Sequence, residues 1–448
     1  MITTDLIIIG AGPGGYRAAE LAAKAGLHTV IIESRHVGGT CLNEGCIPTK
    51  TYARNAEVLS LVREAALYGI DTGGGPTFSL QRTRQRKDEV VEQLRSGIDT
   101  LLAHPAITLV RGEARFADAH TILVDGETAY TAPHIIVATG SVPKTLHLES
   151  PACRRVLDSS DLLQLDSLPS SLCIVGAGVI GMEFASIFAA FGTQVTVVEY
   201  LKECLPALDS DVAKRLRKTL ERRGVTFCMQ CAVKAIDDSG VAYDDKKGQR
   251  HTVQADEVLM AVGRAPRVSD DFGRAGFAYD ARTGIAVDDH MQTTVPGIYA
   301  IGDVNGRTML AHAAEMQAAR VVNHILGKTD EIRLDIIPAA IFTAPEAASV
   351  GKSEDQLKAE GVAYECRKAF HRANGKALAM GETEGMVKLL SEPEAGRILG
   401  CHAYGAHSAD MVQEVSVLMC RQTTVAQLRH MVHIHPTLSE IVLAAAEQ

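Results

Sequence analysis

The sequence predicts an α/β fold, and three observations lead to this prediction. A short apolar run, a glycine-rich turn, a helix-forming stretch and a second apolar run follow one another twice along the 448 residues. In each copy a glutamate stands 18 positions after the third motif glycine, from Gly15 to Glu33 and from Gly181 to Glu199. From about Ile337 strand-like pieces alternate with turns and are followed by two helices, which indicates a separate α+β domain.

The first copy predicts a βαβ unit near the N-terminus. Residues 5–10 form an apolar run that ends in glycine, which is typical of a buried parallel strand. Residues 16–25 are alanine-rich and favour a helix that Gly26 ends, and residues 29–33 favour a second strand. The turn between the first strand and the helix is formed by residues 10–15.

The second copy repeats this order in the middle of the chain. Residues 172–175 predict a strand, 176–181 a turn, 182–191 a helix that Gly192 ends, and 194–199 a second strand. Residues 135–140 and 258–263 are further apolar runs that stop at glycine, and we expect them to add strands to the two sheets.

Both turns have the spacing of a dinucleotide-binding loop. The first glycine allows the tight turn, the second lets the backbone approach a pyrophosphate, and the third lets helix and strand pack closely. The helix N-terminus stabilises the phosphate charge, and the glutamate accepts hydrogen bonds from a ribose. Since Glu199 would repel a 2′-phosphate and residues 200–202 contain no arginine, we expect NAD rather than NADP at the second turn. The sequence thus predicts two Rossmann-like dinucleotide-binding domains.

Composition and charge argue against several classes of partner. Hydrophobic residues make up 46% of the chain, and Lys and Arg are scattered among Asp and Glu with a net charge of -9. This distribution disfavours a nucleic-acid or anionic-membrane surface. No apolar run approaches the ~20 residues that span a bilayer, and no signal peptide precedes the first strand, so we expect a cytoplasmic protein without a membrane partner.

Two cysteine pairs are close in sequence among the ten cysteines. Cys41 and Cys46 follow the first βαβ unit directly and are near enough for a short bridged loop. No second cysteine pair stands at zinc-ligand spacing to them, so we expect no metal. Cys228 and Cys231 lie in an expected strand, where residues three apart point to opposite faces. For the second pair we therefore favour packing over a redox or metal role.

One segment carries a specific resemblance. Residues 38–50, Gly-Gly-Thr-Cys-Leu-Asn-Glu-Gly-Cys-Ile-Pro-Thr-Lys, resemble the active-site signature of the class I pyridine nucleotide-disulfide oxidoreductases, and within that family most closely the dihydrolipoamide dehydrogenases. The resemblance runs from Asp5 to the C-terminus. It includes residues 138–140, 176–181 with Glu183, 300–303, 309–312 and 433–440.

The resemblance implies FAD and NAD as cofactors, and it implies a role for each matching residue. Lys50 matches a lysine beside the reactive flavin nitrogen that is ion-paired to the position of Glu183. The positions that match FAD-binding residues are Gly10, Gly12, Gly14, Gly15, Glu33, Gly39, Thr40, Lys50, Gly112, Ala114, Thr139, Gly140, Asp303, Met309 and Ala311. Those that match NAD-binding residues are Gly176, Gly178, Val179, Ile180, Gly181, Glu199, Val233 and Gly263.

The resemblance also implies a homodimer with an acid–base pair near the C-terminus. An imidazole such as that of His435 titrates near neutral pH and can take a proton from a thiol, and the carboxylate of Glu440 can fix its tautomer. In the family this histidine serves the neighbouring subunit. The implied domains are 1–143 and 267–336 for FAD, 144–266 for NAD, and 337–448 for the dimer interface.

Three functions remain in view at this point. The first is oxidation of a dihydrolipoyl dithiol by NAD through Cys41, Cys46 and FAD, in which Cys41 exchanges with the substrate. The second is a glutathione-type or mercuric reductase, disfavoured by Glu199 and by the absence of cysteine from residues 441–448. The third is a docking subunit of a 2-oxo acid dehydrogenase or glycine-cleavage complex, which is compatible with the first because those complexes carry lipoyl proteins.

Overall fold

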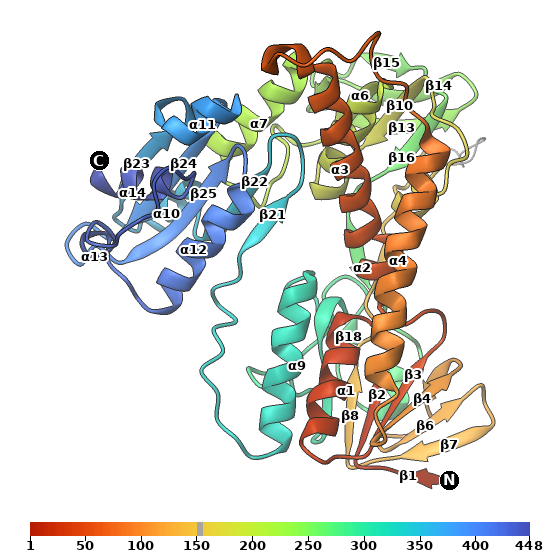
Figure 1. The fold of residues 1–448 in the computed structure, drawn as a ribbon. Helices are drawn as coiled ribbons and strands as arrows, with labels where there is room; N and C mark the ends of the chain where they lie inside the picture. Colours follow the sequence, from red (N-terminus) through yellow and green to blue (C-terminus); the bar gives the residue numbers. More distant parts are fainter. Residues whose placement is uncertain (150–155) are drawn as a thin grey trace. The chain divides into compact units, whose positions relative to one another are not determined.

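A computed structural model describes residues 1–149 and 156–448 (Figure 1). The chain forms two compact units. The first contains Met1–Thr51, Gln81–Lys144 and Gly263–Leu334, and the second contains Tyr52–Leu80, Thr145–Val262 and Asp335–Gln448. Pro151, near which the sequence indicates a boundary, and Cys153 lie outside the described residues.

A five-stranded parallel sheet is the centre of the first unit. Its strand order is β20-β8-β2-β3-β4, with β2 at Leu6–Ile9, β3 at Thr29–Glu33, β4 at Ile107–Arg111, β8 at His134–Val137 and β20 at Ile298–Ala300. All four residues of β2 are buried, as expected for a strand covered on both faces. Helices α1 (Pro13–Lys24) and α9 (Ala311–Ile325) pack side by side (Figure 1). The first predicted βαβ unit is therefore confirmed.

Smaller elements complete the first unit. A second sheet has the order β1-β7-β6-β5, formed by Ile2–Thr3, Thr128–Thr131, Thr121–Val124 and Ala114–Phe116. Two short ribbons pair β17 (Arg264–Pro266) with β9 (Ser141–Pro143) and β18 (Tyr279–Asp280) with β19 (Gly284–Ile285). The remaining helices are α2 (Gly39–Glu44), α4 (Leu80–Leu102), α8 (Phe272–Ala275) and the 3-10 turn η2 (Gly302–Asn305). Helix α3 (Cys46–Arg63) begins in the first unit and belongs to the second from Tyr52 onward.

The second unit contains the second predicted βαβ pattern. Its parallel sheet has the order β12-β11-β10-β16, formed by Thr226–Met229, Gln194–Glu199, Ser171–Val175 and Glu257–Met260. An antiparallel sheet joins β13 (Ala232–Asp237), β14 (Gly240–Asp244) and β15 (Arg250–Val253). The helices of this part are α5 (Ser159–Leu162), α6 (Val179–Phe191) and α7 (Ser210–Arg222), with the 3-10 turn η1 at Ala65–Tyr68.

The predicted α+β part from Ile337 onward is also present. Its antiparallel sheet has the order β21-β22-β25-β24-β23, formed by Ala339–Ile341, Ala347–Gly351, Ile398–Tyr404, Met386–Ser391 and Glu365–Phe370. The helices are α10 (Glu354–Glu360), α11 (Gly375–Met380), α12 (Ser408–Cys420), α13 (Val425–Leu428) and α14 (Glu440–Glu447), with a 3-10 turn η3 at His371–Ala373. Two of them, α12 and α13, follow the last strand, as the sequence predicts. On α12 the side chains of Met411, Val412, Val415 and Met419 are buried, and the Thr424 side chain caps α13.

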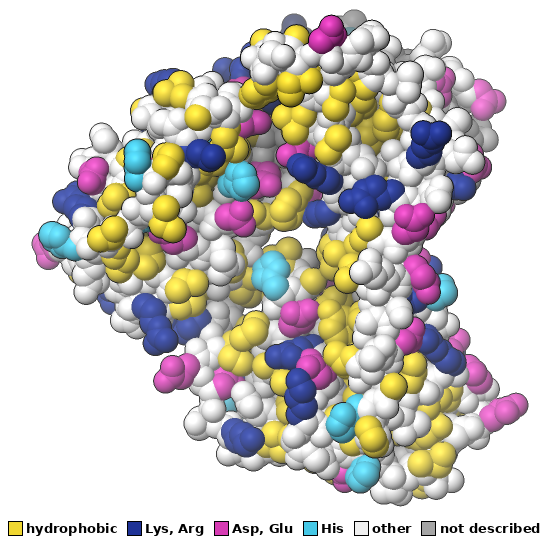
Figure 2. Space-filling view, in the orientation of Figure 1, with side chains coloured by type: hydrophobic (Ala, Val, Ile, Leu, Met, Phe, Trp, Pro, Cys, Tyr) yellow, Lys and Arg dark blue, Asp and Glu magenta, His cyan; other side chains and the backbone are white. Residues whose placement is uncertain are grey.

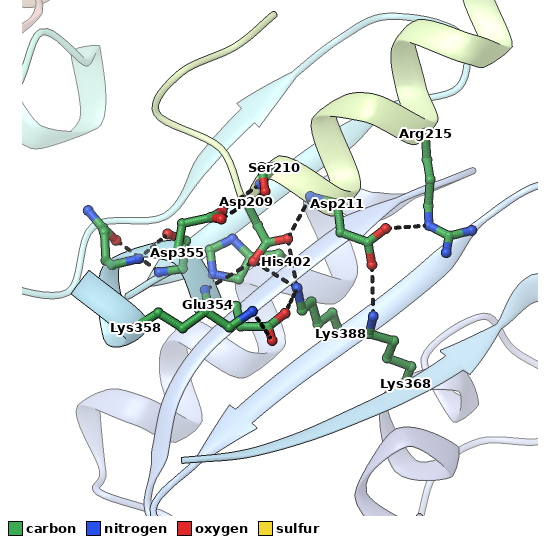
Figure 3. Close-up of polar contacts among 12 residues, drawn as sticks. Asp209, Ser210, Asp211, Arg215, Glu354, Asp355, Lys358, Lys368, Lys388 and His402 are labelled. Atoms are coloured by element: carbon green, nitrogen blue, oxygen red, sulfur yellow. Dashed lines mark hydrogen bonds and ion pairs between the residues drawn. The ribbon is translucent and has the colours of Figure 1, made fainter. Parts of the chain in front are cut away.

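An ion cluster links the segment before α7 to the C-terminal sheet within the second unit (Figure 3). The ammonium of Lys388, on β24, lies 2.8 Å from Oδ1 of Asp209 and also pairs with Glu354 at the start of α10. The side chains of Lys388 and Asp209 are 1% and 0% exposed. Because buried charges require partners, this cluster fixes the two segments against each other.

The second cysteine pair departs from the sequence prediction. Strand β12 ends at Met229, and Gln230 has a left-handed backbone with φ 59°. The alternation of a strand therefore does not continue to Cys231. Cys231 belongs to the same apolar cluster against which Cys228 packs, so the expectation that the two side chains point to opposite faces was wrong.

The surface carries both signs of charge. On the face drawn in Figure 2, dark-blue Lys and Arg side chains lie among magenta Asp and Glu side chains, as the composition predicts. Within residues 1–149 and 156–448, no helix combines the length and the apolar character needed to cross a membrane.

Candidate active site

The predicted pair Cys41 and Cys46 forms a disulfide. Cys41 lies on α2 and Cys46 is the first residue of the 18-residue helix α3, with 4.6 Å between the two Cα atoms. The N-terminus of a long helix stabilises negative charge, and a thiolate is the reactive form of cysteine. This position therefore favours a thiolate at Cys46 when the bridge is opened.

The redox segment packs directly on the first glycine-rich turn. The N–H of Gly38 donates to the carbonyl oxygen of Ala11 at 2.8 Å. At Gly39 an added Cβ would lie only 2.7 Å from the Cα of Gly12, so no larger residue fits there without displacing the backbone. The bridge is thus held beside the turn that the sequence assigns to a dinucleotide.

Asn43 and Arg95 hold the redox loop, and the sequence analysis missed both. The Asn43 amide nitrogen donates to the carbonyl oxygens of Val37 (2.9 Å) and Gly39 (2.8 Å). Its oxygen accepts two hydrogen bonds from the guanidinium of Arg95 on α4, at 3.1 and 2.8 Å. Asn43 stands between the two cysteines and could have been singled out there, whereas no pattern in the sequence points to Arg95.

The first turn has the shape of a pyrophosphate cradle. An added Cβ on Gly15 would lie 1.9 Å from the carbonyl oxygen of Gly10, so helix and strand touch at this point. At Gly12, by contrast, the nearest heavy atom to an added Cβ is 3.9 Å away. Protein packing alone does not require glycine at position 12. An added Cβ at Gly12 would make only an ordinary contact with the protein, so the close approach of a phosphate group to the α1 N-terminus is the reason for glycine that dinucleotide binding supplies.

The carboxylate of Glu33 braces this turn. Its Oε2 accepts the N–H of Ala11 at 2.8 Å, and its Oε1 accepts the N–H of Arg35 at 2.8 Å. Gly112 lies at the same edge, since its N–H donates to the Glu33 carbonyl oxygen at 3.2 Å. The carboxylate keeps lone pairs for further donors, as hydrogen bonding to a ribose would require.

Further predicted residues lie in the same unit. Asp303, in η2, accepts a hydrogen bond from the Ser141 hydroxyl at 2.5 Å, and that hydroxyl accepts one from Nε of Arg264 at 2.7 Å. Ser141 and Arg264 were not predicted. The neighbouring predicted residues are Thr139 and Gly140 after β8, Ala114 on β5, Thr40 on α2, Lys50 on α3, Met309 before α9, Ala311 at its start, and Gly14 where α1 meets α9.

The second turn repeats the geometry of the first. An added Cβ on Gly181 would lie 2.1 Å from the carbonyl oxygen of Gly176, whereas at Gly178 the nearest atom is 4.0 Å away. The carboxylate of Glu199 accepts the N–H of Ala177 at 2.6 Å and that of Leu201 at 2.7 Å. The second copy can therefore hold a dinucleotide in the same way as the first.

Two further residues predicted for the second site follow this turn directly. Val179 and Ile180 begin α6, and Val179 is exposed. Glu183, on the same helix, is buried, and its Oε1 accepts the N–H of Phe342 at 2.9 Å. Val233 lies on β13. Gly263 and Lys50 belong to the first unit and Glu183 to the second, so the ion pair between Lys50 and Glu183 stays a prediction.

His435 and Glu440, which the resemblance predicts as an acid–base pair, lie within hydrogen-bond distance of each other. Nδ1 of His435 lies 2.9 Å from Oε1 of Glu440, and Oε2 accepts the N–H of Thr437 at 2.8 Å. The hydrogen bond from Thr437, followed by that from His435, lowers the pKa of Glu440 below its ordinary value. The ionised carboxylate fixes the imidazole with Nε2 available as the base.

In the single chain this histidine faces outward. Its side chain is 81% exposed, and the nearby apolar side chains of Val432 and Ile434 are 100% and 79% exposed. Exposed apolar residues around a polar catalytic pair are typical of a surface that another chain covers. The arrangement suits a histidine that acts in a neighbouring subunit.

Two family descriptions match the chain. Residues 4–318 match the pyridine nucleotide-disulphide oxidoreductases, and residues 337–446 match the dimerisation domain of the same proteins. The second match supports a homodimer.

Similar proteins extend over the full length. The chain is 37% identical to the dihydrolipoyl dehydrogenase of Mycoplasma pneumoniae, over 98% of this chain and 96% of that protein. It is also 37% identical to the dihydrolipoyl dehydrogenase of Bacillus subtilis, over 97% and 96% of the two chains. Among solved structures, the HOCl-induced flavoprotein disulfide reductase RclA from Escherichia coli matches with a TM-score of 0.86 and 30% identity, over 99% of both chains.

Proposed function

Because the chain belongs to the pyridine nucleotide-disulphide oxidoreductase family, we propose that it oxidises a protein-bound dihydrolipoyl dithiol and reduces NAD. The observation that carries this proposal is the bridge between Cys41 and Cys46 beside the first glycine-rich turn. The enzyme uses FAD and NAD, and the family predicted from the motifs is confirmed. When bound beside the bridge, FAD would supply the two-electron chemistry that connects the dithiol pair to hydride transfer to NAD.

The first unit would hold FAD. The turn at Gly12, in front of the α1 N-terminus, would accept the pyrophosphate, and Glu33 would accept hydrogen bonds from the ribose. Asp303, which Ser141 and Arg264 orient, and Lys50 would contribute the remaining polar contacts that the family resemblance implies.

The bridge exchanges with the substrate in two steps. His435 of the neighbouring subunit takes the proton of the first substrate thiol, and the resulting thiolate attacks Sγ of Cys41. The bond between the two protein sulfurs breaks, and Cys46 leaves as a thiolate that the α3 N-terminus stabilises. The second substrate sulfur then attacks the mixed disulfide, which releases the cyclic disulfide and Cys41. The substrate loses two electrons and the protein pair gains them.

The second unit would hold NAD rather than NADP. Glu199 would accept hydrogen bonds from the adenosine ribose, and its carboxylate would repel a 2′-phosphate at the same place. Both carboxylate oxygens are already fixed by backbone N–H groups, so Glu199 cannot rotate away from such a phosphate without breaking them. The lipoyl carriers of 2-oxo acid dehydrogenase or glycine-cleavage complexes are the partners we propose, and the cytoplasm is the location.

Turnover with purified protein tests this proposal. We expect the FAD-loaded enzyme to reduce NAD with dihydrolipoamide, and to work poorly with NADP. Cys41→Ser and Cys46→Ser should keep FAD bound and lose turnover, whereas Cys420→Ser, which removes an exposed thiol elsewhere, should not. Near-normal turnover in either active-site variant would rule out the exchange mechanism.

A reductase of another substrate is the alternative. Parallel assays with glutathione disulfide and Hg(II), each with NADH and NADPH, separate the two. If the enzyme oxidised NADPH with glutathione disulfide or Hg(II) faster than it reduced NAD with dihydrolipoamide, the proposed function would be wrong and the alternative would take its place.

A further inference from the structure

Three polar side chains of the second unit meet in one apolar cluster away from the bridge. Cys231 and Tyr243 are buried members of this cluster, and the half-buried Cys228 packs against it. The phenolic O–H of Tyr243 donates to Sγ of Cys228 at 3.3 Å. The proposed reaction uses none of these groups.

The backbone between the two cysteines leaves the strand geometry, so Cys231 packs into the same apolar cluster as Cys228. Met229 is the extended last residue of β12, and Gln230 is left-handed with φ 59°. An extended residue followed by a left-handed one is the order found in a type II turn, whose first and fourth Cα atoms lie within about 7 Å of each other. The thiol of Cys231 turns back and donates to the Met229 carbonyl oxygen at 3.4 Å. The Cα separation of about 4.4–6.8 Å that a disulfide needs lies within the range of such a turn.

The two thiols differ in reactivity. Burial raises the pKa of the Tyr243 phenol, which therefore stays a protonated donor toward Cys228. A donated hydrogen bond stabilises a thiolate, and Cys228 is the more exposed of the pair. Burial also raises the pKa of the Cys231 thiol, which keeps it protonated. Cys228 is thus suited to react first and Cys231 to react second.

We propose that Cys228 and Cys231 form a second dithiol–disulfide couple, which a peroxide oxidises. The Cys228 thiolate attacks one peroxide oxygen, the O–O bond breaks, and a sulfenic acid and hydroxide form. The Cys231 thiol then attacks the sulfenic sulfur, and water leaves as the S–S bond forms. In total two thiols and one hydrogen peroxide give one disulfide and two waters. Metal binding is less suitable, because the described part of the chain holds no group of three or more His, Cys, Asp or Glu able to bind an ion.

This couple is connected to the residue that we assign to NAD. The N–H of Cys231 donates to the Glu199 carbonyl oxygen at 2.8 Å, and the N–H of Gln230 donates to the Leu201 carbonyl oxygen at 3.0 Å. Leu201 in turn donates to the Glu199 carboxylate. A disulfide between Cys228 and Cys231 would tighten the turn at Gln230 and so disturb the hydrogen bonds to Glu199 and Leu201. It should therefore weaken NAD binding. This last step rests on the proposed role of Glu199.

The experiment uses the oxidised FAD-loaded enzyme, in which Cys41 and Cys46 are already bridged and thus protected. After treatment with hydrogen peroxide and alkylation of remaining thiols, the tryptic peptide 224–234 carries both cysteines of the pair. We expect it to be two hydrogens lighter and unalkylated, and dithiothreitol to reverse the change. The Kd for NAD should rise about fivefold, the scale of one weakened hydrogen bond, when binding is measured without any dithiol, because dihydrolipoamide would reduce the new bridge as dithiothreitol does.

Variants separate the possible results. Cys228→Ser should abolish the rise in Kd, whereas Cys420→Ser should retain it. A peptide that keeps two alkylated thiols, or an equal rise in the Cys228→Ser enzyme, overturns the proposal. A bridge that forms without a change in the Kd for NAD overturns the connection to NAD. A Glu199→Ala enzyme with unchanged KM for NAD would instead refute the NAD assignment, and the peptide mass would still decide on the couple itself.

Discussion

Replacing Lys388 with methionine tests whether charge pairing holds the second unit together. The Lys388 ammonium lies 2.8 and 3.0 Å from the two carboxylate oxygens of Asp209 and also pairs with Glu354 (Figure 3). Burial lowers the pKa of this ammonium, but the hydrogen bonds to the two carboxylates outweigh that effect and raise it overall. Methionine has a similar length and no charge, so it removes the pairing with little change in packed volume.

The expected loss follows from the burial of Asp209. With its side chain 0% exposed, the carboxylate would remain in the interior without a cation, and such a change costs about 3–5 kcal/mol of unfolding free energy. Asp209 would still accept the N–H groups of Asp211 (3.1 Å) and Glu354 (3.0 Å). These hydrogen bonds partly stabilise the unpaired carboxylate, so we expect a loss of unfolding free energy near the lower limit, about 3 kcal/mol.

Urea unfolding followed by circular dichroism measures this change. The matched control is Lys368→Met, because Lys368 pairs with Asp211 at 2.8 Å but its side chain is 33% exposed, so its loss should be about 0–1 kcal/mol. The double variant Asp209→Asn with Lys388→Met should recover part of the stability, since no unpaired charge remains. A Lys388→Met loss equal to that of the control, with no recovery in the double variant, would refute the reasoning.

Three further predictions follow from the same geometry. Burial alone would raise the pKa of Glu354, but hydrogen bonds from Lys358 and Lys388 help to lower it to about 2. The contribution of Glu354 to the free energy of unfolding is therefore complete above about pH 4.5 and is lost as the pH falls toward 2. Urea midpoints measured at a series of acidic pH values check this prediction. His435→Gln should lower the dihydrolipoamide kcat by about 10²–10⁴-fold with FAD still bound, measured by steady-state kinetics and flavin absorbance; a loss under tenfold would contradict a base role. Glu199→Ala should raise the KM for NAD about tenfold, with the dithiol KM as the internal control.

Local patterns predicted the parts of the site that depend on spacing. The two glycine-rich turns, their glutamates, the pair Cys41 and Cys46, and the contact of His435 with Glu440 are all made by residues close in sequence. For such residues the backbone fixes the distance, so residue type and separation suffice. The strands around the turns followed from the same local apolar runs.

Contacts between distant segments could not be predicted in this way. Arg95 lies 52 residues from the Asn43 that it holds, and Arg264 lies 123 residues from Ser141. Lys388 stands on a strand as one lysine among many, and only the packed structure shows that it is buried. Gln230 has a left-handed backbone that redirects Cys231, and nothing in its residue type predicts this conformation.

The two glycine-rich turns are nearly identical, so the difference between the two sites must come from the segments that follow their glutamates. After Glu33 the chain returns to the turn itself, because Gly38 and Gly39 pack against Ala11 and Gly12 and carry the disulfide there. After Glu199 the chain also returns to its turn, since the N–H of Leu205 donates to the Ala177 carbonyl oxygen at 2.9 Å, but here Leu201 also contacts a neighbouring strand end, where Gln230 donates to its carbonyl oxygen. The segment after the first glutamate thus carries the bridge between Cys41 and Cys46, whereas Glu199, the proposed ribose ligand, is linked by backbone hydrogen bonds to the segment that holds a different pair of thiols, Cys228 and Cys231.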